Sequence, residues 1–220
     1  MSCSTFSELC DMAPAPRDSS DKNIYMGRIG RREKADYATS NRCNTFICVL
    51  ESPRNEMNIA AVMRNIDTLG VKMLCVVDTF NVLPSNWEEM RTNRHLMKIS
   101  ASAIKWAYVK KFASTSECIE YLQKNNFMSV VTSPHLTTIE GVQNVWLDEG
   151  RFTEKKLAVW FGNEVKGISD EAVRASKKCI QMKTFGMAES MNLAVSTGIV
   201  MYEITKQRRQ FRKLKASGIC

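Results

Sequence analysis

An arginine stands on the polar side of a helical pattern in residues 55–70. Apolar residues recur there at helical spacing, at Ile59, Val62, Met63, Ile66 and Leu69. At roughly 100° per residue, Arg64 points about 160° away from the centre of this apolar stripe. The helix would therefore present a permanent positive charge on its outer side. An ordinary exposed arginine is the commoner case when this helix is taken alone.

A turn rich in glycine and polar residues follows the apolar run 157–161. Gly162 and Gly167 bracket Asn163 and Glu164, and Ser169 stands before two acids, as an N-cap residue does. Glycines in such a turn let main-chain groups approach a ligand closely. A tight connection from strand to helix needs the same glycines, so both interpretations stay open for this segment alone.

A third segment, residues 180–203, places polar side chains before a long apolar helical pattern. The chain turns at Gly186, and Ser190 and Asn192 stand at the start of a helix that is apolar as far as Tyr202. The first N–H groups of a buried helix lack partners within the helix. Ser190 and Asn192 could cap these groups or hold a ligand, and capping is the commoner role.

Short apolar runs alternate with helical patterns between these segments. Runs typical of strands lie at 45–50, 72–78, 107–112, 127–133 and 156–162, and helical patterns lie at 59–69, at 115–124, after Ser169 and from about Ser190 into the C-terminal tail. This alternation predicts an α/β fold with a mostly parallel sheet flanked by helices. Ligands of such sheets bind at the carboxyl ends of the strands. Neither a phosphate loop nor a G-x-G-x-x-G fingerprint occurs, which argues against nucleotide hydrolysis and NAD chemistry.

Basic residues gather near both ends of the chain. Residues 22–42 carry six basic and two acidic side chains and residues 205–220 carry six basic ones and no acid, whereas 43–204 are nearly neutral. We expect a disordered segment at 1–21, a basic arm at 22–42, one domain at 43–207 and a basic tail at 208–220. The arm and the tail could bind RNA phosphates or be solvated helices. The candidate RNA-binding residues are Arg31, Arg32, Arg42, Arg64, Arg208, Arg209 and Arg212.

The cysteines and histidines do not form a recognisable metal motif. Eight cysteines are scattered without a C-x-x-C pair, and only His95 and His135 accompany them. We therefore expect no metal and a reducing compartment, with the cytoplasm as the location because the N-terminus lacks an apolar signal region. No stretch approaches the roughly 18 to 20 apolar residues that span a bilayer, so no membrane partner is expected.

The three segments together resemble the SpoU/TrmH family of RNA ribose 2'-O-methyltransferases, within the SPOUT superfamily. Residues 58–64 are similar to the family pattern N-x-G-A-x-x-R, 161–169 to F-G-N-E-x-x-G-[LI]-S, and 180–192 to I-x-I-P-M-x-G-x-x-x-S-[LM]-N. The resemblance covers roughly residues 43–207. Three residues depart from it, because Ala60 replaces a glycine, Lys183 a proline and Thr184 a methionine.

The resemblance implies a fold, a cofactor and a set of site residues. The C-terminal segment would form a deep trefoil knot, and two subunits would pair so that each active site borrows residues from its partner. S-adenosylmethionine would be held by Gly162, Asn163, Glu164, Gly167, Ile180, Met182, Ser190, Asn192 and Leu193. Arg64 would be the catalytic arginine, with Asn58, Glu164, Ser190 and Asn192 as further catalytic residues.

The resemblance also predicts the reaction. We expect a homodimeric methyltransferase that methylates the ribose of tRNA, at a guanosine in the D-loop region. The short basic N-terminal arm favours tRNA, since relatives acting on ribosomal RNA often carry a sizeable extra RNA-binding domain. The alternatives are methylation of ribosomal RNA, or an inactive RNA-binding homologue, which the departures at Ala60, Lys183 and Thr184 motivate.

Overall fold

The computed structural model describes residues 30–218, in two compact units. One unit is Arg42–Phe211, and the described part of the other holds α2 (Arg31–Asn41) and the chain from Arg212 onward. The segment expected to be disordered, 1–21, and the first residues of the basic arm lie outside the described residues. α2 is a helix within that arm.

A parallel sheet of seven strands forms the centre of the unit Arg42–Phe211. Its strands occur in the order β3-β2-β1-β6-β4-β7-β5, and every neighbouring pair is parallel. In chain order the strands are β1 (Cys43–Glu51), β2 (Val71–Val77), β3 (Val109–Phe112), β4 (Met128–Thr132), β5 (Gln143–Trp146), β6 (Leu157–Phe161) and β7 (Lys178–Gln181). The central strands are apolar along nearly their whole length because both faces of the sheet are covered.

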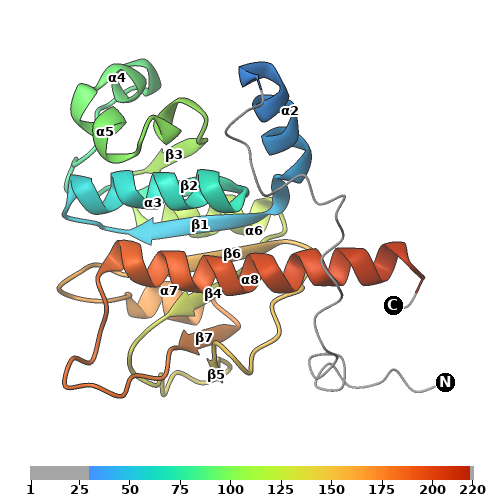
Figure 1. Ribbon diagram of the computed structural model, residues 1–220. Coiled ribbons are helices and arrows are strands. Elements are labelled where there is room, and N and C mark those ends of the chain that lie inside the picture. Colours follow the sequence, from blue (N-terminus) through green and yellow to red (C-terminus); the bar gives the residue numbers. More distant parts are fainter. Residues whose placement is uncertain (1–29, 219–220) are drawn as a thin grey trace. The chain divides into compact units, whose positions relative to one another are not determined.

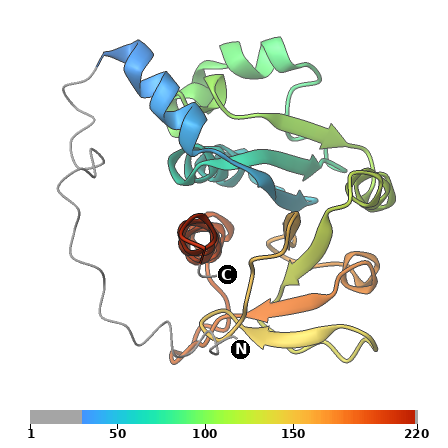
Figure 2. The ribbon, with the colours of Figure 1, turned by 90° about the vertical axis from the view of Figure 1, so that its right-hand side faces the viewer.

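Helices cover the two faces of this sheet. The helices of the unit are α3 (Glu56–Leu69), α4 (Trp87–Thr92), α5 (Arg94–Ile99), the short 3-10 helix η3 (Ala103–Lys105), α6 (Thr115–Lys124), α7 (Asp170–Arg174) and α8 (Leu193–Ala216), which continues into the second unit. α3 and α8 lie on one face, as Figure 1 shows. Figure 2 shows α6 and α7 on the opposite face.

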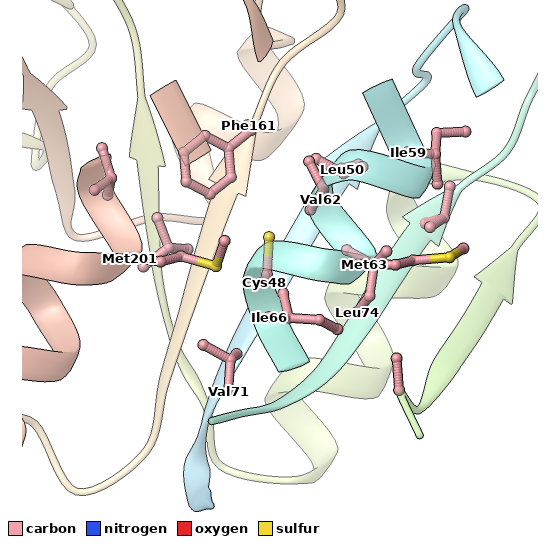
Figure 3. Packing of buried hydrophobic residues seen from close by; sticks show 14 of the residues in the cluster. Cys48, Leu50, Ile59, Val62, Met63, Ile66, Val71, Leu74, Phe161 and Met201 are labelled. Atoms are coloured by element: carbon pink, nitrogen blue, oxygen red, sulfur yellow. The ribbon is translucent and has the colours of Figure 1, made fainter. Parts of the chain in front are cut away.

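Each face has its own hydrophobic core. On one face the predicted stripe of α3 packs against β1 and β2, where Ile59, Val62, Met63 and Ile66 are buried (Figure 3). Met201 of α8 joins the same core beside β6 (Figure 3). The other core gathers residues of α6 and α7 against the opposite sides of the strands. Burial of these side chains stabilises the fold by about 25 cal/mol per Å² of apolar surface.

The α/β class, the parallel sheet and the flanking helices were predicted correctly, and the helix 115–124 has its expected bounds. The elements α4, α5, η3 and β5 were missed. α4 and α5 have six residues each, and the side chains of Asn86 and Asn93 cap them. β5 is a mostly exposed edge strand, so its sequence lacks the apolar run that marks the inner strands.

Across residues 30–218, no helix is both long and apolar enough to span a membrane. The trefoil knot stays a prediction.

Candidate active site

A cavity of about 650 Å³ opens at the carboxyl ends of β4, β6 and β7. The strands are in parallel register, so Thr132, Phe161 and Ile180 lie side by side at this edge. Three chain segments form the walls: the loop after β4, the turn 162–169 and the loop 183–192 with the start of α8. All nine residues expected to hold the cofactor line the cavity: Gly162, Asn163, Glu164, Gly167, Ile180, Met182, Ser190, Asn192 and Leu193.

The turn 162–169 closes on itself through main-chain hydrogen bonds. Asn163 N–H donates to Gly167 O at 2.8 Å, and Gly167 N–H donates to Asn163 O at 2.9 Å. A Cβ atom on Gly162 would lie 2.2 Å from the backbone of Gly167 and Ile168, so this position excludes every other residue. Gly167 has φ +70°, which glycine adopts without strain. The two glycines therefore build the turn.

Asn163 organises the same turn from within. Its Oδ1 accepts hydrogen bonds from Val165 N at 2.8 Å and Lys166 N at 3.0 Å, and its Nδ2 donates to Ser52 O. The side chain thus joins the turn after β6 to the loop after β1. Asn163 is buried and lines the cavity. Its side-chain oxygen and nitrogen form hydrogen bonds that hold the turn.

A hydrogen-bonded network joins the three segments that the motifs identify. Asn58 Nδ2 donates to Glu164 Oε1 at 3.0 Å, and Asn192 Nδ2 donates to Asn58 Oδ1 at 3.0 Å. The backbone N–H of Arg54 donates to Glu164 Oε2, also at 3.0 Å. One side chain each from α3, the turn after β6 and the start of α8 therefore meet at the rim of the cavity.

The network determines the charge of Glu164. Burial raises the pKa of its carboxyl, but the hydrogen bonds from Asn58 and from the backbone N–H of Arg54 outweigh this, and the pKa lies below its usual value of 4.5. Glu164 is consequently ionised at neutral pH. A carboxylate with a lowered pKa is a weak general base and a good hydrogen-bond acceptor.

Asn192 and Ser190 differ in what they do at the start of α8. Asn192 Oδ1 accepts from Ala194 N at 2.9 Å, so this residue caps the helix while its amide group binds Asn58. Ser190 is exposed and lines the cavity. Within residues 30–218 its hydroxyl has no hydrogen-bond partner, which leaves it available to a ligand.

Glu51 supports the turn from behind, and the sequence analysis missed it. This residue ends β1 with only 4% of its surface exposed. Its Oε1 accepts from Thr115 Oγ1 at 2.7 Å and Ser169 Oγ at 2.6 Å, and its Oε2 accepts from Ser169 N at 2.8 Å. Glu51 therefore fixes the end of the turn against the start of α6. The signal in the sequence was an acidic residue directly after the apolar run 45–50.

The loop after β4 forms a further wall that was missed. Thr132, Ser133, Pro134 and His135 line the cavity. The loop is held in place, because Thr132 Oγ1 donates to Trp160 O at 2.9 Å and Gln181 Nε2 donates to His135 O at 3.2 Å. These residues end or follow the predicted strand 127–133, so the rule that ligands bind at carboxyl ends of strands could have identified them.

The three departures from the family pattern have different surroundings. Ala60 is fully buried in α3. Lys183 forms ion pairs with Asp148 Oδ2 at 2.9 Å and Glu149 Oε1 at 2.7 Å, and Thr184 lines the cavity. The hydrogen bonds that Lys183 donates to Glu149 and Asp148 raise the pKa of Lys183, and the bond from Lys183 lowers the pKa of Asp148. The lysine thus ties the loop 183–192 to the segment after β5.

Arg64 does not line the cavity of its own chain. It is exposed on α3, and across the described residues its guanidinium has no hydrogen-bond or ion-pair partner. Its neighbour Asn65 donates to Ala194 O at 2.8 Å, which holds this part of α3 against the start of α8. The expected catalytic arginine thus takes no part in the network that joins Asn58, Glu164 and Asn192.

One of the expected RNA-binding residues has a different role. Arg208 is buried, and its guanidinium donates to Phe152 O, Glu154 O and Thr45 Oγ1 at 3.2, 2.7 and 2.6 Å. The expectation that Arg208 contacts RNA is therefore wrong. Its donors join α8 to the segment before β6, and the hydrogen bond from this arginine also helps to lower the pKa of the Cys43 thiol against the opposing effect of burial.

The other basic candidates are differently placed. Arg209 is exposed and donates to Leu69 O at 2.8 Å, and Arg42 is half-buried beside Asp67 at 3.4 Å. Arg32 and Arg212 are exposed in the other unit, where α2 also places Arg31. Binding of RNA by these arginines stays a prediction.

Within the described residues, no three of the His, Cys, Asp and Glu side chains are placed to hold a metal ion.

Comparisons with known proteins agree with this geometry. The model of the SpoU rRNA Methylase family matches residues 45–202. The tRNA (guanosine(18)-2'-O)-methyltransferase of Aquifex aeolicus is 27% identical over 186 residues, which are 84% of this chain and 81% of that protein. The enzyme of the same name from Thermus thermophilus is 24% identical, over 81% and 83% of the two chains.

Solved structures give the same result. The A. aeolicus TrmH/SpoU tRNA modifying enzyme superposes with a TM-score of 0.65 at 25% identity, over 82% of this chain and 85% of that one. The SpoU methyltransferase AviRb from Streptomyces viridochromogenes, in complex with AdoMet, has the same fold, with a TM-score of 0.61 at 18% identity over 77% and 62%. The family model covers well over half of the sequence, and this chain belongs to the SpoU rRNA methylase family.

Proposed function

We propose that this protein is an S-adenosylmethionine-dependent ribose 2'-O-methyltransferase that acts on tRNA, at a guanosine of the D-loop region. The observation that carries the proposal is the hydrogen-bonded network of Asn58, Glu164 and Asn192 at the rim of one cavity. The curated relatives named tRNA (guanosine(18)-2'-O)-methyltransferase support tRNA as the substrate.

The cavity suits S-adenosylmethionine in size and chemistry. A volume of about 650 Å³ lies within the range of pockets that hold ligands of this size. Apolar walls from Phe161, Ile180 and Leu193 would hold the adenine ring, while polar groups at the rim would bind hydroxyl, amino and carboxylate groups. The cofactor supplies an electrophilic methyl group on a positively charged sulfur.

The residues of the chain position the reactants and stabilise charge. Glu164 is ionised and bound by two donors, so it orients groups at the rim and does not accept the ribose proton. Arg64 binds the phosphate next to the target ribose and stabilises negative charge that develops on the 2'-oxygen. A guanidinium has a pKa above ~12 and is a poor proton acceptor, which disfavours a role as general base.

A second copy of the chain completes the site in this proposal. Val195, Ile199 and Tyr202 form an exposed stripe along α8 at helical spacing, and Met191 precedes it. Such a stripe in a globular protein is typical of an interface. Arg64 lies outside the cavity of its own chain. Pairing of two copies along α8 would bring the partner's Arg64 to the cavity.

Two measurements test the proposal. Calorimetric titration with S-adenosylmethionine should show binding, and labelled methyl should then pass to unmodified tRNA and appear as a 2'-O-methylguanosine by mass spectrometry. Transfer to ribosomal RNA fragments and not to tRNA would favour the ribosomal alternative. Tight RNA binding without transfer to either would favour the inactive homologue.

Arg64→Ala tests the role of the arginine. We expect kcat to fall by about 100-fold or more, while the affinity for S-adenosylmethionine stays unchanged, because loss of one oxyanion donor commonly costs this much. Arg94→Ala is the matched control, since Arg94 is an exposed arginine on α5. Full activity of a folded Arg64→Ala protein would remove this residue from the mechanism.

A further inference from the structure

An exposed aromatic ring lies beside the candidate site on a neighbouring loop. Phe80 follows β2, and 48% of its surface is exposed. β1 and β2 pair in parallel up to Glu51 and Val77, so the loops after these strands leave the sheet side by side. Thr79 Oγ1 donates to Ser52 Oγ at 3.0 Å, which joins the two loops. The ring is therefore held next to the loop after β1, whose Ser52 and Arg54 contact Asn163 and Glu164.

The loop that carries Phe80 is fixed by its own hydrogen bonds. The buried carboxylate of Asp78 accepts from Val82 N at 2.9 Å and Leu83 N at 3.0 Å, and it forms an ion pair with Lys111 at 2.9 Å. Asn81 turns the chain with φ 51°. A loop held in this way presents Phe80 in a defined position. Less conformational entropy of the loop is then lost when a ligand binds.

Arg54 covers one side of the ring with an unpaired cation. Its guanidinium carbon lies 4.8 Å from the centre of the Phe80 ring. Across residues 30–218 the Arg54 side chain has no hydrogen-bond or ion-pair partner, although its backbone N–H binds Glu164. The donors of this guanidinium are thus free for an anion at the edge of the candidate site.

A second arginine and aromatic pair in the molecule shows what is particular here. Arg42 lies 5.6 Å from the ring of Tyr108, but its guanidinium donates to Asp67 Oδ1 and to Trp106 O. Tyr108 comes just before β3, at the amino ends of the strands, away from the cavity. The Phe80 pair differs because its cation is unpaired and it adjoins the site.

We propose that Phe80 and Arg54 bind one nucleotide of the RNA substrate, with a base stacked on the ring and a phosphate on the guanidinium. This inference rests on the proposed function. An aromatic face and a free guanidinium are the two groups that bind unpaired nucleotides in proteins. Phe80 and Arg54 do not line the cavity, so the cofactor does not occupy this position. The site would hold the target nucleotide, or one adjacent to it, outside the RNA stack.

Variants at Phe80 separate stacking from simple apolar contact. We expect Phe80→Ala and Phe80→Leu to weaken RNA binding about tenfold, within the range that loss of one base stack produces, and Phe80→Trp to retain it. Arg54→Ala should weaken RNA binding and reduce its salt dependence by about one released ion. Tyr108→Ala, the matched control, should bind RNA as the wild type does.

The readouts are the Kd for unmodified tRNA by filter binding, the Kd for S-adenosylmethionine by calorimetry, and the mass in solution by light scattering. Weaker RNA binding with unchanged cofactor affinity and unchanged mass supports the proposal. It is overturned if Phe80→Ala binds RNA as the wild type does, if Phe80→Leu retains binding, or if the change alters the mass or the cofactor affinity.

Failure of the proposed function would look different. A wild-type protein that transfers no methyl to any RNA contradicts the proposed function, while its RNA Kd still tests Phe80. A wild-type enzyme that transfers methyl and a Phe80→Ala enzyme with the same kcat/KM for tRNA contradict the stacking site alone.

Discussion

Two of the three walls of the cavity are held in different ways. The turn 162–169 is bonded to itself and to its surroundings, through Asn163 and Gly167 within the turn and through Glu51 and Ser52 outside it. The loop 183–192 lacks such bonds. Between Lys183 and Asn192, which anchor its two ends, residues 184–191 form no hydrogen bond or ion pair with any described residue.

This difference indicates how the site is preorganised. The turn has its final geometry before any ligand binds, because its polar groups are already satisfied. The loop exposes Phe185 and Met187 almost completely, so these two apolar side chains are not buried by any other part of the described chain. In the proposed enzyme, cofactor, RNA or the second subunit would cover them. The turn 162–169 is thus a rigid wall that defines the pocket, and the loop 183–192 is an adjustable wall that can adapt to what binds.

Gly162→Ala would break the rigid wall and have the largest effect. The new methyl group would lie 2.2 Å from the backbone of Gly167 and Ile168, so the turn must open. We expect a loss of about 3 kcal/mol in the free energy of unfolding and loss of cofactor binding. Gly186→Ala in the other wall is the control, since nothing lies within 4 Å of its added Cβ. Denaturant unfolding measures both, and equal stabilities would refute the contrast.

Glu51→Gln would loosen the rigid wall from behind. The amide keeps one acceptor oxygen, but its NH₂ group would face the N–H of Ser169 or the hydroxyls that Glu51 now accepts. Leaving a buried donor unpaired costs about 2 kcal/mol. We expect lower stability and about tenfold weaker binding of S-adenosylmethionine, measured by calorimetry.

Glu117→Gln gives the comparison for this change, because the Glu117 carboxylate also accepts a backbone N–H, from Ala113, but is not bonded to the turn 162–169 as Glu51 is. If Glu51→Gln lowers the stability without changing the affinity for S-adenosylmethionine, Glu51 supports the fold and does not position the turn.

The sequence predicted the inner strands and the motif residues better than the groups that hold them in place. Apolar runs identify β1, β2, β4 and β6 because both faces of those strands are buried. Nothing local in the sequence shows that Glu51 meets Ser169, 118 positions further along. Such contacts depend on strand order, which crosses over in this sheet.

Arg208 shows a signal that the charge count concealed. It follows Met201 and Ile204 at a spacing of seven and four residues, which places it on the buried face of α8. The prediction that Arg208 binds RNA rested on its charge and left this spacing out. The helical spacing would have placed it inside, where its donors are satisfied by the carbonyl groups of Phe152, Glu154, Lys155 and Thr45.

The link between the two walls should depend on pH through Glu164. Its pKa is lower in the folded chain than its usual 4.5, so its contribution to stability is complete above pH ~4.5 and is lost as the pH falls through the lower, folded value. Glu164→Gln lacks this titration. Unfolding of the two proteins between pH 3 and 7 should show the stability of the wild type decreasing more steeply on the acidic side. Parallel curves would contradict the lowered pKa.

Lys183→Ala would release the start of the adjustable wall, with the smallest effect. The ion pairs of Lys183 with Asp148 and Glu149 are partly exposed, and exposed pairs contribute little. We expect about two- to fivefold weaker binding of S-adenosylmethionine at low salt and little difference at high salt, where the charges are screened. Lys183→Pro, which restores the family residue, should bind the cofactor with little dependence on salt, because a ring and not a charge then restrains the chain. If Lys183→Ala binds as the wild type does at every salt concentration, the tether has no role, and the loop is positioned by its ligands alone.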